Sequence, residues 1–262
     1  MTIGAIPSTS GVEAAIRRAS GATGVDFDFL MKTARRESAM NPQARARTSS
    51  AAGLFQFIEQ TWLATVKRHG PQHGYGQYAD LIHKGADGRW RVEGSARNVV
   101  LDLRFDAQAA STMAAELASS NAAYLRGRTG REPGAGDLYA AHFLGPAGAA
   151  KLMEAMVTRP GASAASIFPE AASANRPIFY RDGRAATVAE VHANLQRTAG
   201  AGSPATGTSV DPAAPELTDK QRAMAARLDR LKQDQGLLAL LLGQDGEGGG
   251  FGGAFSPAAD KT

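Results

Sequence analysis

Glu37 is the residue of this sequence with the clearest potential for acid–base chemistry. It follows Leu30 by seven positions and Ala34 by three, so on a helix the three side chains would share one apolar face. Burial on such a face disfavours the charged form of a carboxyl group and raises its pKa, and the C-terminal end of a helix acts in the same direction. A carboxyl group of raised pKa is what a general acid needs near neutral pH.

The position of Glu37 also allows an ordinary structural role. Arg35 and Arg36 precede it directly, and an ion pair with one of them would neutralise the carboxylate. From the helix position alone, this structural interpretation is favoured. The residues that follow Glu37 along the chain reverse that preference.

Two short blocks follow Glu37 and carry a family resemblance. Glu37-Ser38 is followed by Asn41-Pro42 and then by SSAAGLFQF at 49–57. This arrangement resembles the soluble lytic transglycosylases of the lysozyme-like superfamily, whose pattern is a catalytic Glu-Ser, an Asn-Pro and a Gly-Leu-Met-Gln loop. The resemblance implies a mainly α, lysozyme-like catalytic domain in which Glu37 is the catalytic residue.

The GLFQF block has the composition of a loop that binds a sugar. Gly53 permits a tight turn or a close approach of a ligand to the backbone, apolar side chains can form walls, and the Gln56 amide offers a donor and an acceptor. Phe55 stands where the family has methionine. The residues expected to contact substrate here are Ser38, Gly53, Leu54, Phe55, Gln56 and Phe57. The structural alternative is a packed turn with one capped amide.

A third block, YAAHFLG at 139–145, lies where the family usually carries Ala-Tyr-Asn-Ala-Gly. Ala141 and Gly145 match that pattern, whereas His142 replaces the tyrosine and Phe143 the asparagine. These departures indicate a divergent branch of the family, similar to enzymes associated with flagella or secretion systems.

Three aromatic residues are further candidates for the substrate cleft. Tyr139 and His142 stand three apart and would share a helix face, so they are expected to line the cleft opposite Glu37. A core tyrosine and a satisfied histidine are the alternative. By the resemblance, Tyr180 occupies the place of a late tyrosine that hydrogen-bonds the catalytic glutamate, and an exposed loop aromatic is the alternative there.

The resemblance implies cleavage of the β-1,4 bond between N-acetylmuramic acid and N-acetylglucosamine in peptidoglycan. Glu37 would act first as acid and then as base, leaving a 1,6-anhydromuramic acid end. A hydrolytic muramidase or phage endolysin on the same fold would need a held water and a second carboxylate, for which Asp80, Asp87 and Asp102 are the candidates. A non-catalytic glycan-binding assembly protein is the third hypothesis.

The elements that must position these residues are helices. Asp26 is a plausible N-cap for a helix that begins at Phe27 and ends before Pro42. Further helices are expected over 59–68, 98–125, 136–143, 147–156 and 187–197. Strand alternation is absent, so any β structure is expected to be a short hairpin.

Composition excludes several classes of function. The 262 residues contain no cysteine, so disulfides and thiolate metal sites are excluded. Gly70-Pro71 separates His69 from His73, so no metal site is expected, and no cofactor motif occurs. Residues 1–198 carry a net charge of +6 and the remainder −2, which favours anionic partners. The arginines are not interleaved with aromatic residues, which argues against nucleic acid.

The chain divides by composition. We expect a disordered N-terminus (1–11), a lysozyme-like transglycosylase domain (12–198), a flexible linker (199–216), an amphipathic helix (217–242) and a Gly-rich disordered tail (243–262). The longest apolar run, Leu237 to Leu242, is too short to span a membrane.

Location and partners follow from the substrate that the resemblance implies. Peptidoglycan glycan strands lie outside the cytoplasmic membrane, and the first residues lack the pattern of a secretory signal. A periplasmic monomer exported without such a signal is therefore expected, with 217–242 recognising a protein of a flagellar or secretion apparatus.

Overall fold

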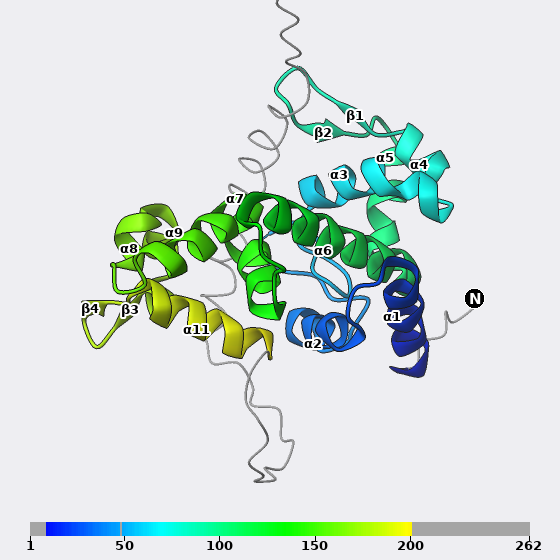
Figure 1. Ribbon diagram of the computed structural model, residues 1–262. Coiled ribbons are helices and arrows are strands. Elements are labelled where there is room, and N and C mark those ends of the chain that lie inside the picture. The colour runs from blue at the N-terminus through cyan, green and yellow to red at the C-terminus, as the bar shows by residue number, and fades with distance from the viewer. Residues whose placement is uncertain (1–8, 48, 201–262) are drawn as a thin grey trace, which may run out of the picture.

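The computed structural model describes residues 9–47 and 49–200, and these residues form a mainly helical protein (Figure 1). The expected linker beyond residue 200, the helix over 217–242 and the Gly-rich tail lie outside the described residues. Among the described helices, none is long and apolar enough to cross a membrane.

The first half of the described chain holds the helix that carries Glu37. Its elements are α1 (Thr9–Thr23), α2 (Phe27–Ser38), α3 (Glu59–His69), the 3-10 turn η1 (Gly70–His73), α4 (Gly76–Asp80), the antiparallel strands β1 (His83–Lys84) and β2 (Trp90–Arg91), α5 (Ala96–Asp102) and the 3-10 turn η2 (Leu103–Phe105). The α1 helix begins at Thr9, so the last three of the eleven residues expected to be disordered are helical.

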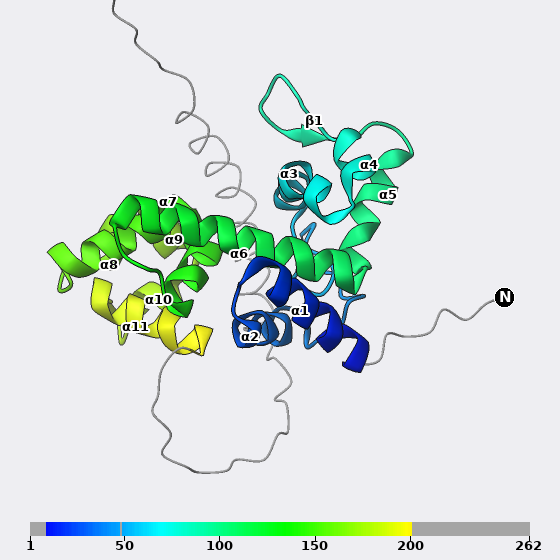
Figure 2. The ribbon, with the colours of Figure 1, turned by 45° about the vertical axis from the view of Figure 1, so that its right-hand side comes forward.

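The second half begins with two long helices. It comprises α6 (Ala107–Thr129), α7 (Ala135–Thr158), α8 (Ala164–Ile167), α9 (Pro169–Ala174), α10 (Arg176–Phe179), the antiparallel strands β3 (Tyr180–Arg181) and β4 (Arg184–Ala185), and α11 (Val188–Ala199). In Figures 1 and 2, α6 runs through the middle of the molecule, with α1 to α5 around one end and α7 to α11 around the other.

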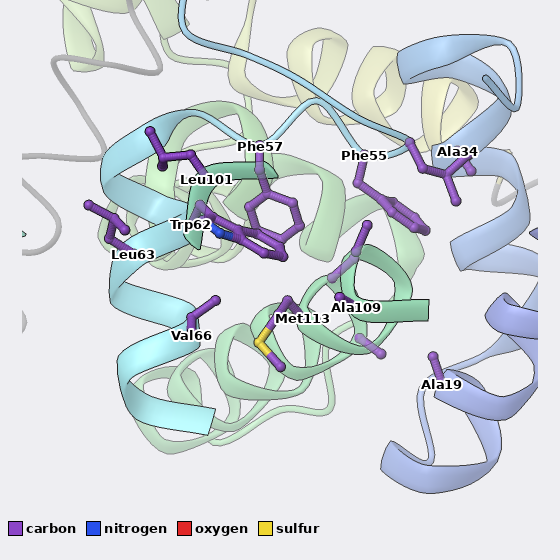
Figure 3. Close-up of a cluster of buried hydrophobic side chains, with 14 of the residues drawn as sticks. Ala19, Ala34, Phe55, Phe57, Trp62, Leu63, Val66, Leu101, Ala109 and Met113 are labelled. Atoms are coloured by element: carbon purple, nitrogen blue, oxygen red, sulfur yellow. The ribbon is translucent and has the colours of Figure 1, made fainter. Parts of the chain in front are cut away.

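Two hydrophobic clusters form the core, and α6 contributes side chains to both. The first joins α1, α2, α3 and α6, and Figure 3 shows its centre, where Phe57 and Trp62 meet edge to face with ring centroids 5.1 Å apart beside Met113. The second joins Leu125 near the end of α6 to helices α7 to α11, around Phe143 and Phe179. Burial of these apolar side chains supplies the main driving force for each half.

Side-chain caps fix several helix ends. Asp26 accepts a hydrogen bond from the Phe29 amide at the start of α2, as the sequence predicts. At the start of α11, Thr187 and Glu190 form a capping box. The Arg184 guanidinium and the Thr187 amide hydrogen-bond the Glu190 carboxylate and lower its pKa to about 2.

The predicted helix over 98–125 is wrong as a single element. Asp106 has extended backbone angles and caps α6 by accepting from the Ala109 amide, so α5 and α6 are separate. Val99, at the start of the predicted helix, is 55% exposed. The predicted boundary between 143 and 147 is confirmed, because Gly145 has φ 73° and interrupts α7 directly before Pro146. The sequence predicts at most one short hairpin, whereas the described residues contain two, each made of strands of two residues.

Candidate active site

Glu37 lies in the last turn of α2, on the side of the helix that faces the rest of the protein. Leu30 and Ala34 on the same helix are buried, and 12% of the Glu37 side chain is exposed. The helix ends one residue later, because Ala39 adopts left-handed backbone angles and returns its N–H to the carbonyls of Ala34 and Arg35. The expected burial of Glu37 near a helix C-terminus is therefore what the structure shows.

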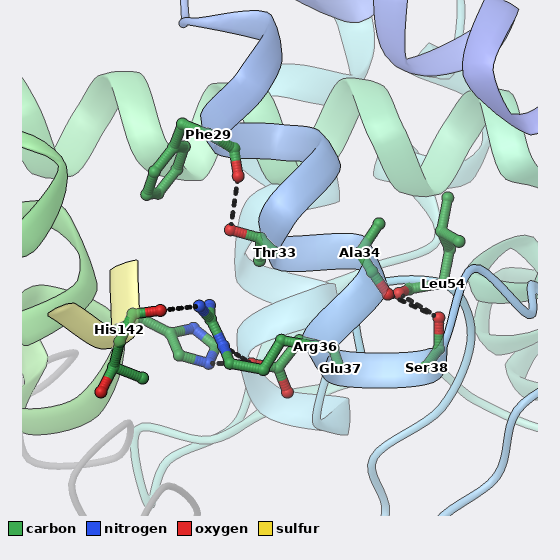
Figure 4. A network of polar contacts seen from close by, with 9 residues as sticks. Phe29, Thr33, Ala34, Arg36, Glu37, Ser38, Leu54 and His142 are labelled. Atoms are coloured by element: carbon green, nitrogen blue, oxygen red, sulfur yellow. Dashed lines mark hydrogen bonds and ion pairs between the residues drawn. The ribbon is translucent and has the colours of Figure 1, made fainter. Parts of the chain in front are cut away.

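Ser38 links the end of α2 to the GLFQF loop. Its hydroxyl donates to the Leu54 carbonyl at 2.8 Å and is 3.1 Å from the Ala34 carbonyl of its own helix (Figure 4). Ser38 thus holds the loop beside Glu37, and Leu54, whose side chain is completely buried, supports the loop from the core.

The loop from Gly53 to Phe57 is tightly shaped. Gly53 has φ 79° and Gln56 has φ 47°, and the backbones of Ala52 and Phe57 pair with each other. The Gln56 side-chain NH₂ donates to the carbonyls of Gly53 at 2.9 Å and Ala44 at 3.3 Å. The amide hydrogens of Gln56, which the sequence analysis considered as donors to a sugar, are therefore used to hold the loop. The positive φ of Gln56 indicates a constrained backbone of the kind found at functional sites.

Two nitrogen groups approach one oxygen of Glu37. Arg36 Nε is 3.4 Å from Glu37 Oε1, and His142 Nε2 is 3.3 Å from the same atom (Figure 4). The Arg36 guanidinium also donates to the Thr198 carbonyl at 3.2 Å, so the end of α11 lies against α2. The carboxyl group thus lies between side chains of α2 and α7.

Tyr139 and His142 lie together, as their spacing predicts. Their rings stack with centroids 6.1 Å apart, and the Arg36 guanidinium carbon is 4.1 Å from the centre of the Tyr139 ring. Burial raises the pKa of Tyr139, as does the charge of Glu37, against the opposing effect of Arg36. Tyr139 is therefore neutral at physiological pH, and its ring orients Arg36 and His142.

A cavity of about 540 Å³ adjoins this cluster. Arg36, Tyr139 and His142 line it, as do Phe55, Gln56 and Phe57 of the loop. Further walls come from Phe29, Ile58, Trp90, Leu117, Leu138 and Tyr124. The described lining residues include Arg36, Lys67 and Arg68 but no aspartate or glutamate; Glu37 lies directly behind Arg36 and His142. The cavity therefore combines apolar walls with positive charge, which favours an anionic ligand.

Several candidate residues lie elsewhere. Tyr180 is on β3 with Arg176 stacked over its ring, and it is not among the described residues that line the cavity. Asp80, Asp87 and Asp102 are likewise absent from the described lining residues, and Asp87 pairs with Arg91 on the hairpin.

Arg104 is a site-forming residue that sequence analysis missed. Its side chain is buried and donates to the carbonyls of Leu101, Ser50 and Phe57 at 2.9, 2.7 and 3.1 Å. Burial lowers the pKa of Arg104, against Glu59, but a guanidinium still remains protonated. Arg104 thus connects the segment before the GLFQF loop to the end of that loop. Nothing in the local sequence distinguishes it from exposed arginines.

The two histidines of the interrupted helix have a common partner that the sequence did not reveal. Glu116 on α6 lies 3.1 Å from His69 Nδ1 and 2.6 Å from His73 Nε2. Burial lowers the pKa of His69, against the attraction of Glu116. Within 9–47 and 49–200, no group of three or more His, Asp or Glu side chains is arranged to hold a metal ion.

A known family model matches less than half of the chain. The matched part includes Glu37, Ser38 and the GLFQF loop, whereas Tyr139 and His142 lie beyond it. At the level of the family, the match supports peptidoglycan cleavage of the lytic transglycosylase type. Residues 14–81, the part of the chain that holds the buried glutamate, match the family model of the transglycosylase SLT domain, within the lysozyme-like superfamily.

Proposed function

We propose that this protein is a peptidoglycan lytic transglycosylase that cleaves the β-1,4 bond between N-acetylmuramic acid and N-acetylglucosamine. The observation that carries the proposal is the environment of Glu37, a mostly buried carboxyl group whose neighbours Arg36 and His142 line a cavity with no aspartate or glutamate among its described lining residues. A reaction that uses one carboxyl group as acid and then as base fits this arrangement.

The proposed reaction begins with a protonated Glu37. The carboxyl group gives its proton to the glycosidic oxygen as the C1–O bond breaks, and the substrate's own N-acetyl group stabilises the positive charge that develops at C1. The 6-hydroxyl oxygen of the muramic acid then bonds to C1, and the Glu37 carboxylate takes up the hydroxyl proton. A 1,6-anhydro end forms, no water is consumed, and Glu37 returns to its starting state.

Two neighbours of Glu37 connect its carboxyl group to the cavity. Arg36 and His142 both approach Oε1, and both also line the cavity, so they hold the carboxyl group at the side where we place the substrate. The constrained Gly53–Phe57 loop supplies two aromatic walls, against which the apolar faces of the sugar rings can pack. Holding the sugar and the carboxyl group in a fixed relation is a large part of what such a site contributes to the rate.

The test is mass spectrometry of the soluble products released from purified peptidoglycan. The wild-type protein is compared with Glu37→Gln, and with Glu13→Gln as a matched control, because Glu13 lies on α1 in an exposed ion pair with Arg17. We expect muropeptides ending in 1,6-anhydromuramic acid from the wild type and the control, and none from Glu37→Gln.

The other outcomes separate the alternatives. Products that carry one added water would identify a muramidase and contradict the one-carboxylate scheme. Full cleavage by Glu37→Gln would exclude Glu37 as the acid. An absence of products from every protein, with binding to peptidoglycan retained, would favour a glycan-binding assembly protein.

We further propose that the protein acts in the periplasm as a monomer, and that 217–242 recognises a flagellar or secretion apparatus. The structure sharpens the test of this role, because Arg36 bonds the Thr198 carbonyl and Lys32 bonds the Gly200 carbonyl at 3.2 Å. A truncated chain must therefore keep residue 200. A chain ending at Gly200 should cleave peptidoglycan normally and fail to be exported; normal export would contradict the proposed role.

A further inference from the structure

All five histidines of the sequence lie within 4 Å of a carboxylate, but one pair involves the proposed catalytic acid. The other pairs are His69 and His73 with Glu116, His83 with Glu93, and His192 with Asp137. Only His142 is paired with Glu37, and it also lines the cavity. The pair joins two helices, since Glu37 is on α2 and His142 on α7.

The geometry holds the imidazole against the carboxyl group. His142 Nε2 is a buried atom 3.3 Å from Glu37 Oε1, and the stacked Tyr139 ring packs against the imidazole. Figure 4 shows the imidazole and the Arg36 guanidinium converging on the same carboxyl group. A change in the charge of His142 is therefore applied directly to Glu37, at a distance where water screens it weakly.

Two neighbours of the pair, Arg36 and Tyr139, keep their charge state over the pH range in which an imidazole titrates. Arg36 on α2 lies against the carboxyl group, Tyr139 on α7 stacks on the imidazole, and α11 contributes the Thr198 carbonyl, which accepts from Arg36. Arginine is protonated at all relevant pH values, and Tyr139 stays neutral because its pKa is raised. Imidazole ordinarily changes charge near pH 6.5.

We propose that His142 is a positioning residue that controls the protonation of Glu37, so that an imidazolium at this position keeps the carboxyl group ionised and restrains cleavage. This inference rests on the proposed function. Because the reaction begins with a protonated Glu37, a positive charge 3.3 Å away opposes the reactive state. Loss of that charge should extend cleavage to higher pH.

The coupling can be measured from either partner, because it is reciprocal. If imidazolium stabilises the ionised carboxyl group, the carboxylate must stabilise the imidazolium by the same free energy. Replacing Glu37 should therefore lower the titration midpoint of His142, and replacing His142 should raise the alkaline limit of cleavage by a similar amount. An opposite charge at this distance typically shifts a midpoint by about 1 pH unit or more.

The first experiment is an NMR titration of the full chain with labelled histidine. His142 is assigned as the signal that disappears in His142→Gln, and its midpoint is compared in the wild type and Glu37→Gln. We expect the midpoint to fall by about 1 pH unit in Glu37→Gln, while His83, paired with Glu93 on the hairpin, keeps its own midpoint as an internal control. An unchanged His142 midpoint would overturn the proposal.

The second experiment is the pH profile of anhydromuropeptide release. We expect the alkaline limb of His142→Gln to lie about 1 pH unit above that of the wild type, with His83→Gln indistinguishable from the wild type. A lower rate at every pH without a displaced limb would show a purely structural role and reject the proposal. His142→Asn repeats the test if the glutamine variant is poorly folded. If the wild type releases no anhydromuropeptides, the proposed function fails, and the titration alone decides the coupling.

Discussion

The backbone carbonyl of Arg104 occupies the space that a side chain at Gly53 would need. A β-carbon added to Gly53 would lie 1.8 Å from the Arg104 oxygen, far inside van der Waals contact. The same arginine donates its guanidinium hydrogens to the carbonyl of Ser50, which precedes the loop, and to that of Phe57, at which the loop ends. Gly53 and Arg104 therefore fit together as one unit that shapes the loop beside Glu37.

Gly53→Ala is expected to destabilise the protein. The substitution adds a clash with backbone atoms and places alanine at φ 79°, and each effect typically costs about 1–3 kcal/mol. Urea denaturation should show a free energy of unfolding lower by about 2–4 kcal/mol. Gly161→Ala is the matched control, because a β-carbon added there would have nothing within 4 Å and the φ of Gly161 is ordinary. Equal stability of the two variants would contradict the fit described above.

Arg104→Met should lower both stability and cleavage. Methionine fills part of the space but leaves the buried carbonyls of Ser50, Phe57 and Leu101 without their side-chain donor, and an unsatisfied buried group costs about 1–3 kcal/mol. We expect a loss of about 2–4 kcal/mol by urea denaturation. Arg97→Met, which removes an exposed arginine paired with Glu59, should cost less than about 1 kcal/mol. Similar losses for both variants would show that Arg104 acts as an ordinary surface charge.

Asp137→Asn should make the free energy of unfolding depend less on pH in the acid range. Burial raises the pKa of Asp137, but hydrogen bonds from His192 and the Gly134 amide, with nearby positive charge, outweigh it and leave the pKa lowered. A carboxyl group whose pKa is lower when folded stabilises the protein above its unfolded pKa, about 3.9, and loses that contribution as pH falls through the folded value. Urea denaturation at a series of pH values from acid to neutral measures the slope. Parallel curves for wild type and variant would contradict this assignment.

Charge at the cavity should affect the affinity for peptidoglycan. Arg68 is exposed and lines the cavity, so Arg68→Glu should weaken sedimentation with purified peptidoglycan several-fold at low salt, with a smaller difference at high salt. Arg159→Glu makes the same charge change at an exposed residue outside the cavity lining and should have little effect. Equal weakening by both variants would indicate a response to net charge alone.

Local signals in the sequence predicted the elements that carry the site. Asp26 marks the start of α2, and the spacing of Leu30, Ala34 and Glu37 identifies the buried face of that helix. Gly145-Pro146 marks the interruption of α7. Each of these signals depends on interactions within a few residues, which is why a single sequence suffices to find it.

Contacts between distant segments could not be predicted in the same way. The prediction of one helix over 98–125 missed the break at Asp106. The apolar spacing there favours a continuous helix, but Asp106 has an extended backbone and caps α6 instead. Arg104 resembles any other basic residue until the loop folds around it. The approach of His142 to Glu37 depends on how α7 packs beside α2, so sequence analysis could expect both in the cleft but could not pair them.

The division of the core into two clusters has a consequence for how the reaction can be tuned. Glu37 belongs to a helix of the first cluster and His142 to a helix of the second, so their 3.3 Å separation depends on how the two clusters are aligned along α6. A substitution deep in the second half, for example at the fully buried Leu152, can alter that alignment without touching the carboxyl group. Repacking of the second cluster, which lies outside the family match, can thus change the environment of the proposed acid from a distance.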